Sequence, residues 1–164
     1  MPVGDFVLHA TDGSPITNAR LRGRWTFLYF GYTFCPDTCP ATLSRLSGVA
    51  RELERQGWDN KRYQVLFVSI DPGRDTPRQV ERFLALFHRD FDGAVGDVET
   101  VTRFAQSFGA GFNRLGTDTP DTYLIAHTTS VYLIDPRARF VATFSPPHDH
   151  RQIAAEFLEI IEFF

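Results

Sequence analysis

Two short runs of almost wholly apolar residues, joined by an amphipathic segment, most constrain how this chain can fold. The first run covers residues 25–32 (WTFLYFGY) and the second covers residues 63–70 (YQVLFVSI). Both are rich in aromatic and β-branched residues and too short for buried helices, so we predict two buried strands. Between them, apolar residues recur at helical spacing from Ala41 to Gln56, and Gly57 ends the pattern. This order predicts parallel strands joined by a right-handed crossover.

The remaining segments extend this unit to an α/β fold. We predict an N-terminal hairpin from residues 5–9 and 15–19, a helix behind Asp75-Thr76-Pro77, a helix over 98–108, a hairpin from 128–134 and 140–144, and a last helix from about Asp149. The polar stretch 109–122 predicts a long loop. The outline is thioredoxin-like, with a central mixed sheet flanked by helices and an N-terminal β-hairpin. No linker or repeat interrupts residues 1–164, so we expect a single domain.

Charge and hydropathy exclude several classes of protein. The chain carries 17 Lys and Arg against 20 Asp and Glu, a net charge of -3, and no basic run. Nucleic acids and anionic membranes are therefore not expected as its main partners. No stretch reaches the roughly 18–20 consecutive apolar residues that span a bilayer. Residues 1–5 lack the basic start and apolar run of a signal peptide, so an anchor or export signal is expected only outside this sequence.

The two cysteines, Cys35 and Cys39, form the most informative local pattern. They lie in the block FCPDTCP (34–40), between a buried strand and a helix, where α/β proteins tend to build their sites. At this spacing one helical turn carries both sulfurs on one side, and a helix N-terminus is expected to lower the pKa of a thiol. The pair could form a disulfide or bind a soft metal such as Cu(I) or zinc. Two inert buried cysteines are the plainer alternative.

Two sulfurs do not complete a metal site. Structural zinc needs four protein ligands, which two cysteines cannot supply, whereas two thiolates and one imidazole suit copper, so a histidine is the third ligand to look for. The candidates are His9, His88, His127, His148 and His150. His9 and His88 are expected to be solvated or structural, and Asp149 between the last two explains its segment as a helix cap. His127 enters a strand at the junction that faces the cysteine turn in a thioredoxin-like sheet. The alternative is a structural histidine bonded to nearby backbone.

Three blocks resemble the Sco/SenC family of copper-binding, thioredoxin-like proteins: GYTFCPDTCP (31–40), SIDPGRDTP (69–77) and HTTSVYLIDP (127–136). The resemblance implies one copper ion per chain, Cu(I) or Cu(II), bound by Cys35, Cys39 and His127. It implies a metallochaperone for the dinuclear copper site of cytochrome c oxidase. Asp71 would lie beside the site as a second-shell residue, although a turn-forming Asp before Pro72 explains it equally well. Ala126 departs from the family, in which an acidic residue is common at that position.

The resemblance also implies partners and a location. The partners are the copper-site subunit of cytochrome c oxidase, other copper chaperones and a thiol reductant. The location is the periplasm or the outer face of the cytoplasmic membrane, where an anchor absent from this chain would hold it. We expect residues 109–122 to be the docking surface, because so long a loop favours function over packing.

Two enzymatic alternatives remain open. A thiol–disulfide oxidoreductase would use Cys35 as the attacking thiolate and Cys39 as the resolving one, to reduce the cysteines of that copper site or of other exported proteins. A peroxidase would oxidise Cys35 to a sulfenic acid, and it ranks last because residues 30–34 lack the Pro-x-x-x-Thr-x-x-Cys pattern.

Overall fold

A computed structural model describes residues 1–35, 38–115 and 124–164 of the chain. In the main sheet the strand order is β2-β1-β5-β4-β3-β8-β9, and β6 pairs with β7 in a separate two-stranded sheet. The strands are β1 (Leu8–Ala10), β2 (Pro15–Ile16), β3 (Trp25–Gly31), β4 (Tyr63–Ser69), β5 (Asp92–Val95), β6 (Phe112–Leu115), β7 (Leu124–His127), β8 (Val131–Ile134) and β9 (Phe140–Phe144). The helices are α1 (Asn18–Leu21), α2 (Thr38–Arg55), α3 (Pro77–Ala85), α4 (Val98–Gln106) and α5 (His150–Ile161).

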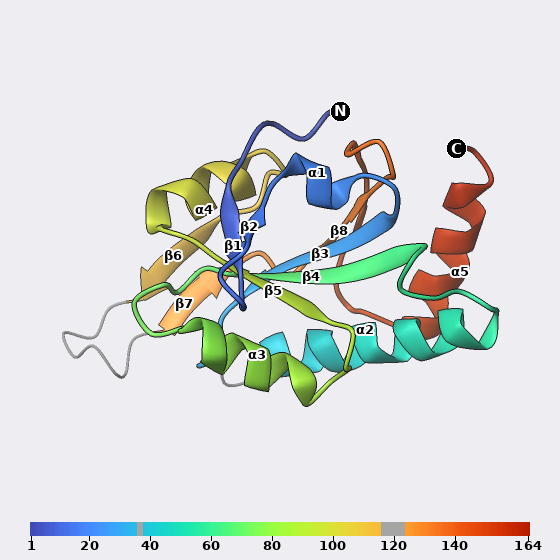
Figure 1. Cartoon of the computed structure of the whole chain (residues 1–164). Coiled ribbons are helices and arrows are strands. Elements are labelled where there is room, and N and C mark those ends of the chain that lie inside the picture. Colours follow the sequence, from blue (N-terminus) through green and yellow to red (C-terminus); the bar gives the residue numbers. More distant parts are fainter. Residues whose placement is uncertain (36–37, 116–123) are drawn as a thin grey trace.

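The centre of the fold is the predicted strand–helix–strand unit. β3 and β4 pair in parallel from Trp25 opposite Tyr63 to Gly31 opposite Ser69, and every residue of both strands is buried. Figure 1 shows α2 and α3 on one side of the main sheet and α4 on the other. The predicted α/β architecture, a mixed sheet flanked by helices, is confirmed. Because β3 and β4 run in parallel, their carboxyl ends meet at one edge, where the loop with Cys35 begins.

Side-chain caps define where the later helices begin. Thr76 is the N-cap of α3 and forms a capping box with Gln79, and Pro77 takes the first helical position as expected. Asp97 caps α4, and Asp149 caps α5 by accepting the backbone N–H groups of residues 151 and 152. The predicted helices after Pro77, Val98 and Asp149 are therefore confirmed. None of the described helices has the length and apolar character needed to cross a membrane.

The structure corrects several sequence-based boundaries. The N-terminal hairpin is present, but residues 18 and 19, expected in its second strand, begin the short helix α1. β5 was not predicted, because Asp92 and Gly93 are poor strand formers. Gly93 is required there, since a Cβ at this position would collide with Val80 of α3. Part of the expected loop 109–122 forms β6, and its residues 116–122 lie outside the described part of the chain.

Candidate metal centre

Three side chains from separate elements meet beyond the carboxyl end of β3. Cys35 follows that strand, Cys39 lies in the first turn of α2, and His127 is the last residue of β7. The Nε2 atom of His127 lies 3.4 Å from the Cys39 sulfur and 4.0 Å from the Cys35 sulfur. One ligand atom from each residue lies within 4.8 Å of the others, so the group could hold a metal ion. The structure therefore brings together the three residues that the sequence singled out.

The spacing of these donors fits a metal ion placed between them. A metal about 2.3 Å from a thiolate sulfur and about 2.0 Å from an imidazole nitrogen, as in zinc sites, separates those donors by about 3.7 Å in a trigonal arrangement. The two observed sulfur–nitrogen distances, 3.4 and 4.0 Å, lie on either side of this value. The donor set, two sulfurs and one imidazole, is the kind that soft metals favour. The residues present thus fit a three-coordinate metal.

A hydrogen bond determines which nitrogen of the His127 ring carries the proton. Nδ1 lies 3.1 Å from the carbonyl oxygen of Thr128, and a carbonyl can only accept, so Nδ1 carries the proton. Nε2 is then the unprotonated nitrogen and can bind a metal. The imidazole packs edge-on against Tyr29 and Tyr32, with ring centroids 6.1 and 5.7 Å away. The Oη of Tyr32 accepts the backbone N–H of Ile125 at 3.0 Å, which ties β7 to the end of β3.

The surroundings of Cys39 favour the protonated form of its thiol. Cys35 is 7% exposed and Cys39 is 0% exposed. The hydrogen bond with Cys35, followed by burial, raises the pKa of the Cys39 thiol. The expectation that the start of a helix lowers the thiol pKa is therefore wrong for Cys39, because burial and the neighbouring sulfur outweigh the helix dipole. A metal that binds here must displace a proton from Cys39.

A buried aspartate that the sequence reading assigned to a helix start fixes the loop before Cys35. The backbone N–H and the hydroxyl of Thr33 donate to the Asp75 carboxylate at 3.1 and 2.6 Å, and the Ser69 hydroxyl donates at 2.7 Å. Burial raises the pKa of Asp75, and these hydrogen bonds oppose that shift. Its burial was the missing signal, because in the sequence Asp75 looks like part of the cap of α3.

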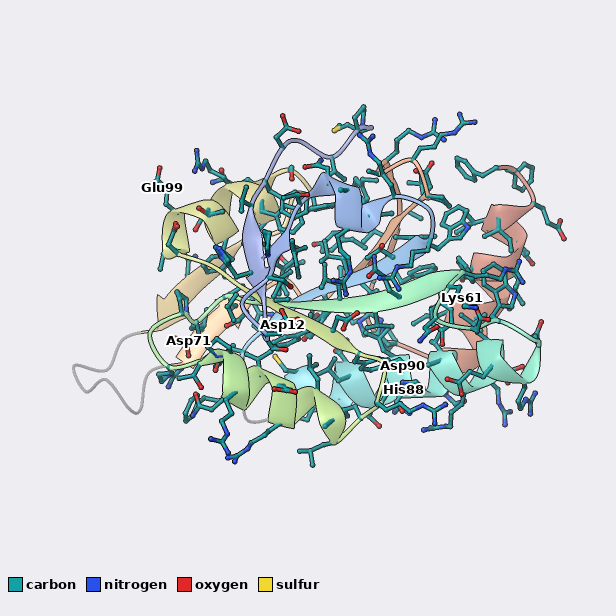
Figure 2. The ribbon with its side chains drawn as sticks, viewed as in Figure 1. Asp12, Lys61, Asp71, His88, Asp90 and Glu99 are labelled. Atoms are coloured by element: carbon teal, nitrogen blue, oxygen red, sulfur yellow. The ribbon has the colours of Figure 1, made fainter. Side chains whose placement is uncertain are left out.

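Asp71, the expected second-shell residue, is connected to the cysteine loop through an arginine. Its side chain is 2% exposed and accepts the Nε–H of Arg74 at 2.6 Å. The Arg74 guanidinium lies over the ring of Phe34, 4.8 Å from its centroid. Figure 2 shows Asp71 at the end of the molecule where β6 and β7 lie. These contacts orient the residue next to Cys35, and a direct role of Asp71 at the metal stays a prediction.

A second group with metal-compatible spacing, Glu54, His88 and Asp90, lies beside α2. Figure 2 shows His88 and Asp90 next to each other. The backbone N–H of Asp90 donates to Nδ1 of His88 at 3.0 Å, so the ring proton lies on Nε2, which donates to Glu54 at 2.7 Å. Both nitrogens are therefore used in hydrogen bonds, and the group connects α2 to the segment after α3. His88 is structural, as the sequence indicated.

The other histidines do not join a group that could hold a metal within the described residues. His9 is exposed on β1. The Nε2 atom of His148 lies 2.7 Å from the carbonyl oxygen of Thr129, and His150 is the first residue of α5. Asp149 between them caps that helix, as the sequence predicted.

Comparison with known proteins gives one family from both sequence and structure. The family model described as SCO1/SenC matches residues 2–162. "Protein SCO1 homolog 1, mitochondrial" from Arabidopsis thaliana is 35% identical over 147 residues, which are 89% of this chain and 43% of that protein. The chain spans about half the length of this and similar curated relatives.

Two solved structures extend the likeness to three dimensions. The crystal structure of Arabidopsis thaliana ScoI with copper bound matches with a TM-score of 0.91 and 30% identity, covering 100% of both chains. The crystal structure of yeast Sco1 with copper bound matches with a TM-score of 0.90 and 27% identity, covering 99% of this chain and 90% of that one. The predicted thioredoxin-like fold is thereby confirmed. With a family model that matches almost its whole length, this chain belongs to the SCO1/SenC family.

Proposed function

We propose that this chain binds one copper ion through Cys35, Cys39 and His127 and delivers it during assembly of the dinuclear copper site of cytochrome c oxidase. The observation that carries the proposal is the unprotonated Nε2 of His127, which faces two buried thiols at 3.4 and 4.0 Å. The copper-bound relatives from Arabidopsis and yeast support the choice of metal. BsSco, a fold neighbour, is described as a member of the Sco family of cytochrome c oxidase assembly proteins.

Copper is the cargo, and the protein supplies ligands that can be exchanged. Both thiols lose their protons on binding, so two thiolates with Cu(I) leave one net negative charge, whereas with Cu(II) the site is neutral. Cys39 is fully buried, while Cys35 and the half-buried His127 lie nearer the surface. An acceptor ligand would therefore approach from the side of Cys35 and His127, and Cys39 would release the ion last.

The recipient that we propose is the copper-site subunit of cytochrome c oxidase, and the location is the periplasm or the outer face of the cytoplasmic membrane. A fold neighbour from Bacillus anthracis is described as a SCO1/SenC family lipoprotein, which supports a position at a membrane surface. Other copper chaperones and a thiol reductant would load and reduce the site.

Thiol–disulfide exchange is the weaker candidate, because it leaves the geometry of His127 unexplained. A dithiol that exchanges with a partner's disulfide needs Cys35 and Cys39 alone. The tautomer of His127, set by the carbonyl of Thr128, instead prepares a metal-binding nitrogen beside the two sulfurs.

Copper titration of the reduced protein, with and without His127, tests the proposal. Under anaerobic conditions we expect the parent to bind one copper per chain and its Cu(II) form to show a thiolate-to-copper absorption band. His127→Ala should lose that band and weaken Cu(II) binding at least ~100-fold, while Cys35 and Cys39 still form a disulfide. His88→Ala, which removes a histidine bonded to Glu54, is the matched control and should titrate like the parent. Equal copper affinity in His127→Ala and the parent would contradict the three-ligand site.

A further inference from the structure

We infer that His148 is a positioning residue that holds the segment carrying His127, and that it thereby favours Cu(II) over Cu(I) at the site. This inference rests on the proposed copper site. His148 lies between β9 and α5, beside the helix cap Asp149 and the first helical residue, His150. The proposed metal site does not use this segment.

The first observation is a short hydrogen bond to the chain just beyond His127. Nε2 of His148 lies 2.7 Å from the carbonyl oxygen of Thr129, and because a carbonyl only accepts, Nε2 is the donor. The preceding carbonyl, that of Thr128, accepts the Nδ1–H of His127 itself. Two successive carbonyl oxygens therefore accept hydrogen bonds from two imidazoles, so the bond from His148 holds the backbone that orients His127.

The second observation is that this hydrogen bond is the polar contact that fixes the His148 ring. Its Nδ1 is buried and has no hydrogen-bond partner within the described residues. A buried acceptor without a partner is unfavourable, so such a placement needs a compensating interaction. The bond to Thr129 is that interaction.

The third observation is that the residues after His148 are held by a helix that packs against the core. Asp149 caps α5, and the ring of Phe157 in that helix packs against Trp25, Phe27 and Trp58 with centroids 5.0 to 5.6 Å apart. His150 touches α2, the helix that carries Cys39, because a Cβ on Gly48 would lie 2.8 Å from the Cβ of His150. The segment thus contacts both the helix of Cys39 and the chain of His127.

The contacts of the β6–β7 pair show what the bond from His148 adds. Thr128 is bonded to Gly111, at the start of the same pair of strands, through its N–H at 3.0 Å and its hydroxyl at 3.1 Å. Bonds on either side of His127 also reach other elements: the N–H of Ile125 donates to Tyr32, and the carbonyl of Thr129 accepts from His148. They lie two residues before and two residues after His127. Loss of the bond from His148 would loosen the chain after His127, which the bonds between Thr128 and Gly111 would still hold.

A looser imidazole affects the two oxidation states of copper differently. Thiolates suit Cu(I), and two of them remain in place on α2 and its preceding loop, whereas Cu(II) depends more on the nitrogen donor. Removing partners that orient a metal ligand weakens metal binding by about 10- to 100-fold. We expect His148→Ala to weaken Cu(II) binding about tenfold and Cu(I) binding less than about threefold, which raises the reduction potential of the bound copper. The ratio of the two losses, about three- to tenfold, corresponds to a rise of about 30 to 59 mV for one electron.

The experiment measures Cu(I) and Cu(II) affinities and the Cu(II) absorption and EPR spectra of four proteins. These are the parent, His148→Ala, His148→Gln, whose amide N–H can replace Nε2–H, and His88→Ala. His88 is a matched control, because it makes a histidine bond of 2.7 Å to Glu54, a residue about 22 Å along α2 from Cys39. We expect altered spectra and a selective loss of Cu(II) in His148→Ala, recovery in His148→Gln and no change in His88→Ala.

Each other outcome has a distinct meaning. Parent-like spectra and affinities in His148→Ala would overturn the inference while leaving the copper site intact. Equal losses of Cu(I) and Cu(II) without recovery in His148→Gln would show a general structural role and also overturn it. A parent protein that binds no copper would overturn the proposed function, and this inference with it.

Discussion

At Gly31, the absence of a side chain leaves the space that the sulfur of Cys39 occupies. A Cβ there would lie 2.9 Å from that sulfur and 2.8 Å from the ring of Phe67. The ring belongs to the core and cannot move aside, so an added methyl group would push on the sulfur. The glycine at the end of β3 is therefore part of the site, although it binds nothing itself.

Replacement of Gly31 by alanine tests this role. We expect Gly31→Ala to lose about 1–3 kcal/mol of unfolding free energy through overpacking, and to weaken copper binding because the Cys39 sulfur is displaced. Denaturant unfolding of the apoprotein and copper titration measure the two effects. Gly4→Ala is the matched control, since nothing lies within 4 Å of a Cβ at Gly4. Unchanged stability and affinity in Gly31→Ala would show that the sulfur has room to move.

The elements of this fold differ in how clearly the sequence encodes them. β3 and β4 were predictable because both are continuous apolar runs, and α3, α4 and α5 because a capping residue begins each one. β5 and α1 were not, because each is short and is held by tertiary contacts: Gly93 of β5 packs under α3, and Arg20 of α1 pairs with Asp92 at 2.7 Å. Local propensity does not record such contacts.

The cap of α5 offers a test at the scale of an element. Asp149 accepts two backbone N–H groups at 2.9 and 3.0 Å, and Asp149→Ala would leave both without their acceptor. We expect Asp149→Ala to lower the free energy of unfolding by about 1 kcal/mol, and Asp149→Asn, which keeps an accepting oxygen, to stay within a few tenths of the parent. Chemical denaturation of the three proteins measures this difference. Equal losses in the two variants would assign the effect to the charge of Asp149 and not to the cap.

At the scale of the whole molecule, the site depends on contacts between distant parts of the chain. Cys35 and Cys39 were recognisable from their position between a strand and a helix, and His127 from its place at a strand junction facing that turn. Asp75 and His148 were not identified as supporting residues, because their roles depend on bonds to Thr33 and Thr129 that only the folded chain creates. Sequence patterns thus indicated the residues at the centre of the site and missed those that hold them.

The burial of weak acids throughout the core predicts how stability depends on pH. Burial raises the pKa of Tyr29, Tyr63 and Tyr132, and contact with Cys35 together with burial raises that of Cys39. Each group therefore keeps its proton longer in the folded chain than in the unfolded one. Its stabilising contribution is complete below the unfolded pKa, about 8.5 for a thiol and about 10 for a phenol, and is lost as the pH rises further.

We accordingly expect the melting temperature of the reduced apoprotein to fall steadily above about pH 8.5. Thermal unfolding followed by circular dichroism across the alkaline range measures this. Cys39→Ser, whose hydroxyl does not titrate there, should delay the onset to the range of the tyrosines. A melting temperature that stays constant up to about pH 11 would contradict these pKa directions.

The loop with the first cysteine is anchored at both ends by independent parts of the scaffold. Asp75 holds Thr33 on one side, and α2 holds Cys39 on the other. The distance between the two sulfurs therefore depends on the number of residues between Thr33 and Cys39. Asp75 and α2 would hold these two residues in place if that number changed. Changing the number of residues between the two cysteines is therefore a direct way to alter which metal ions the site binds without changing the surrounding fold.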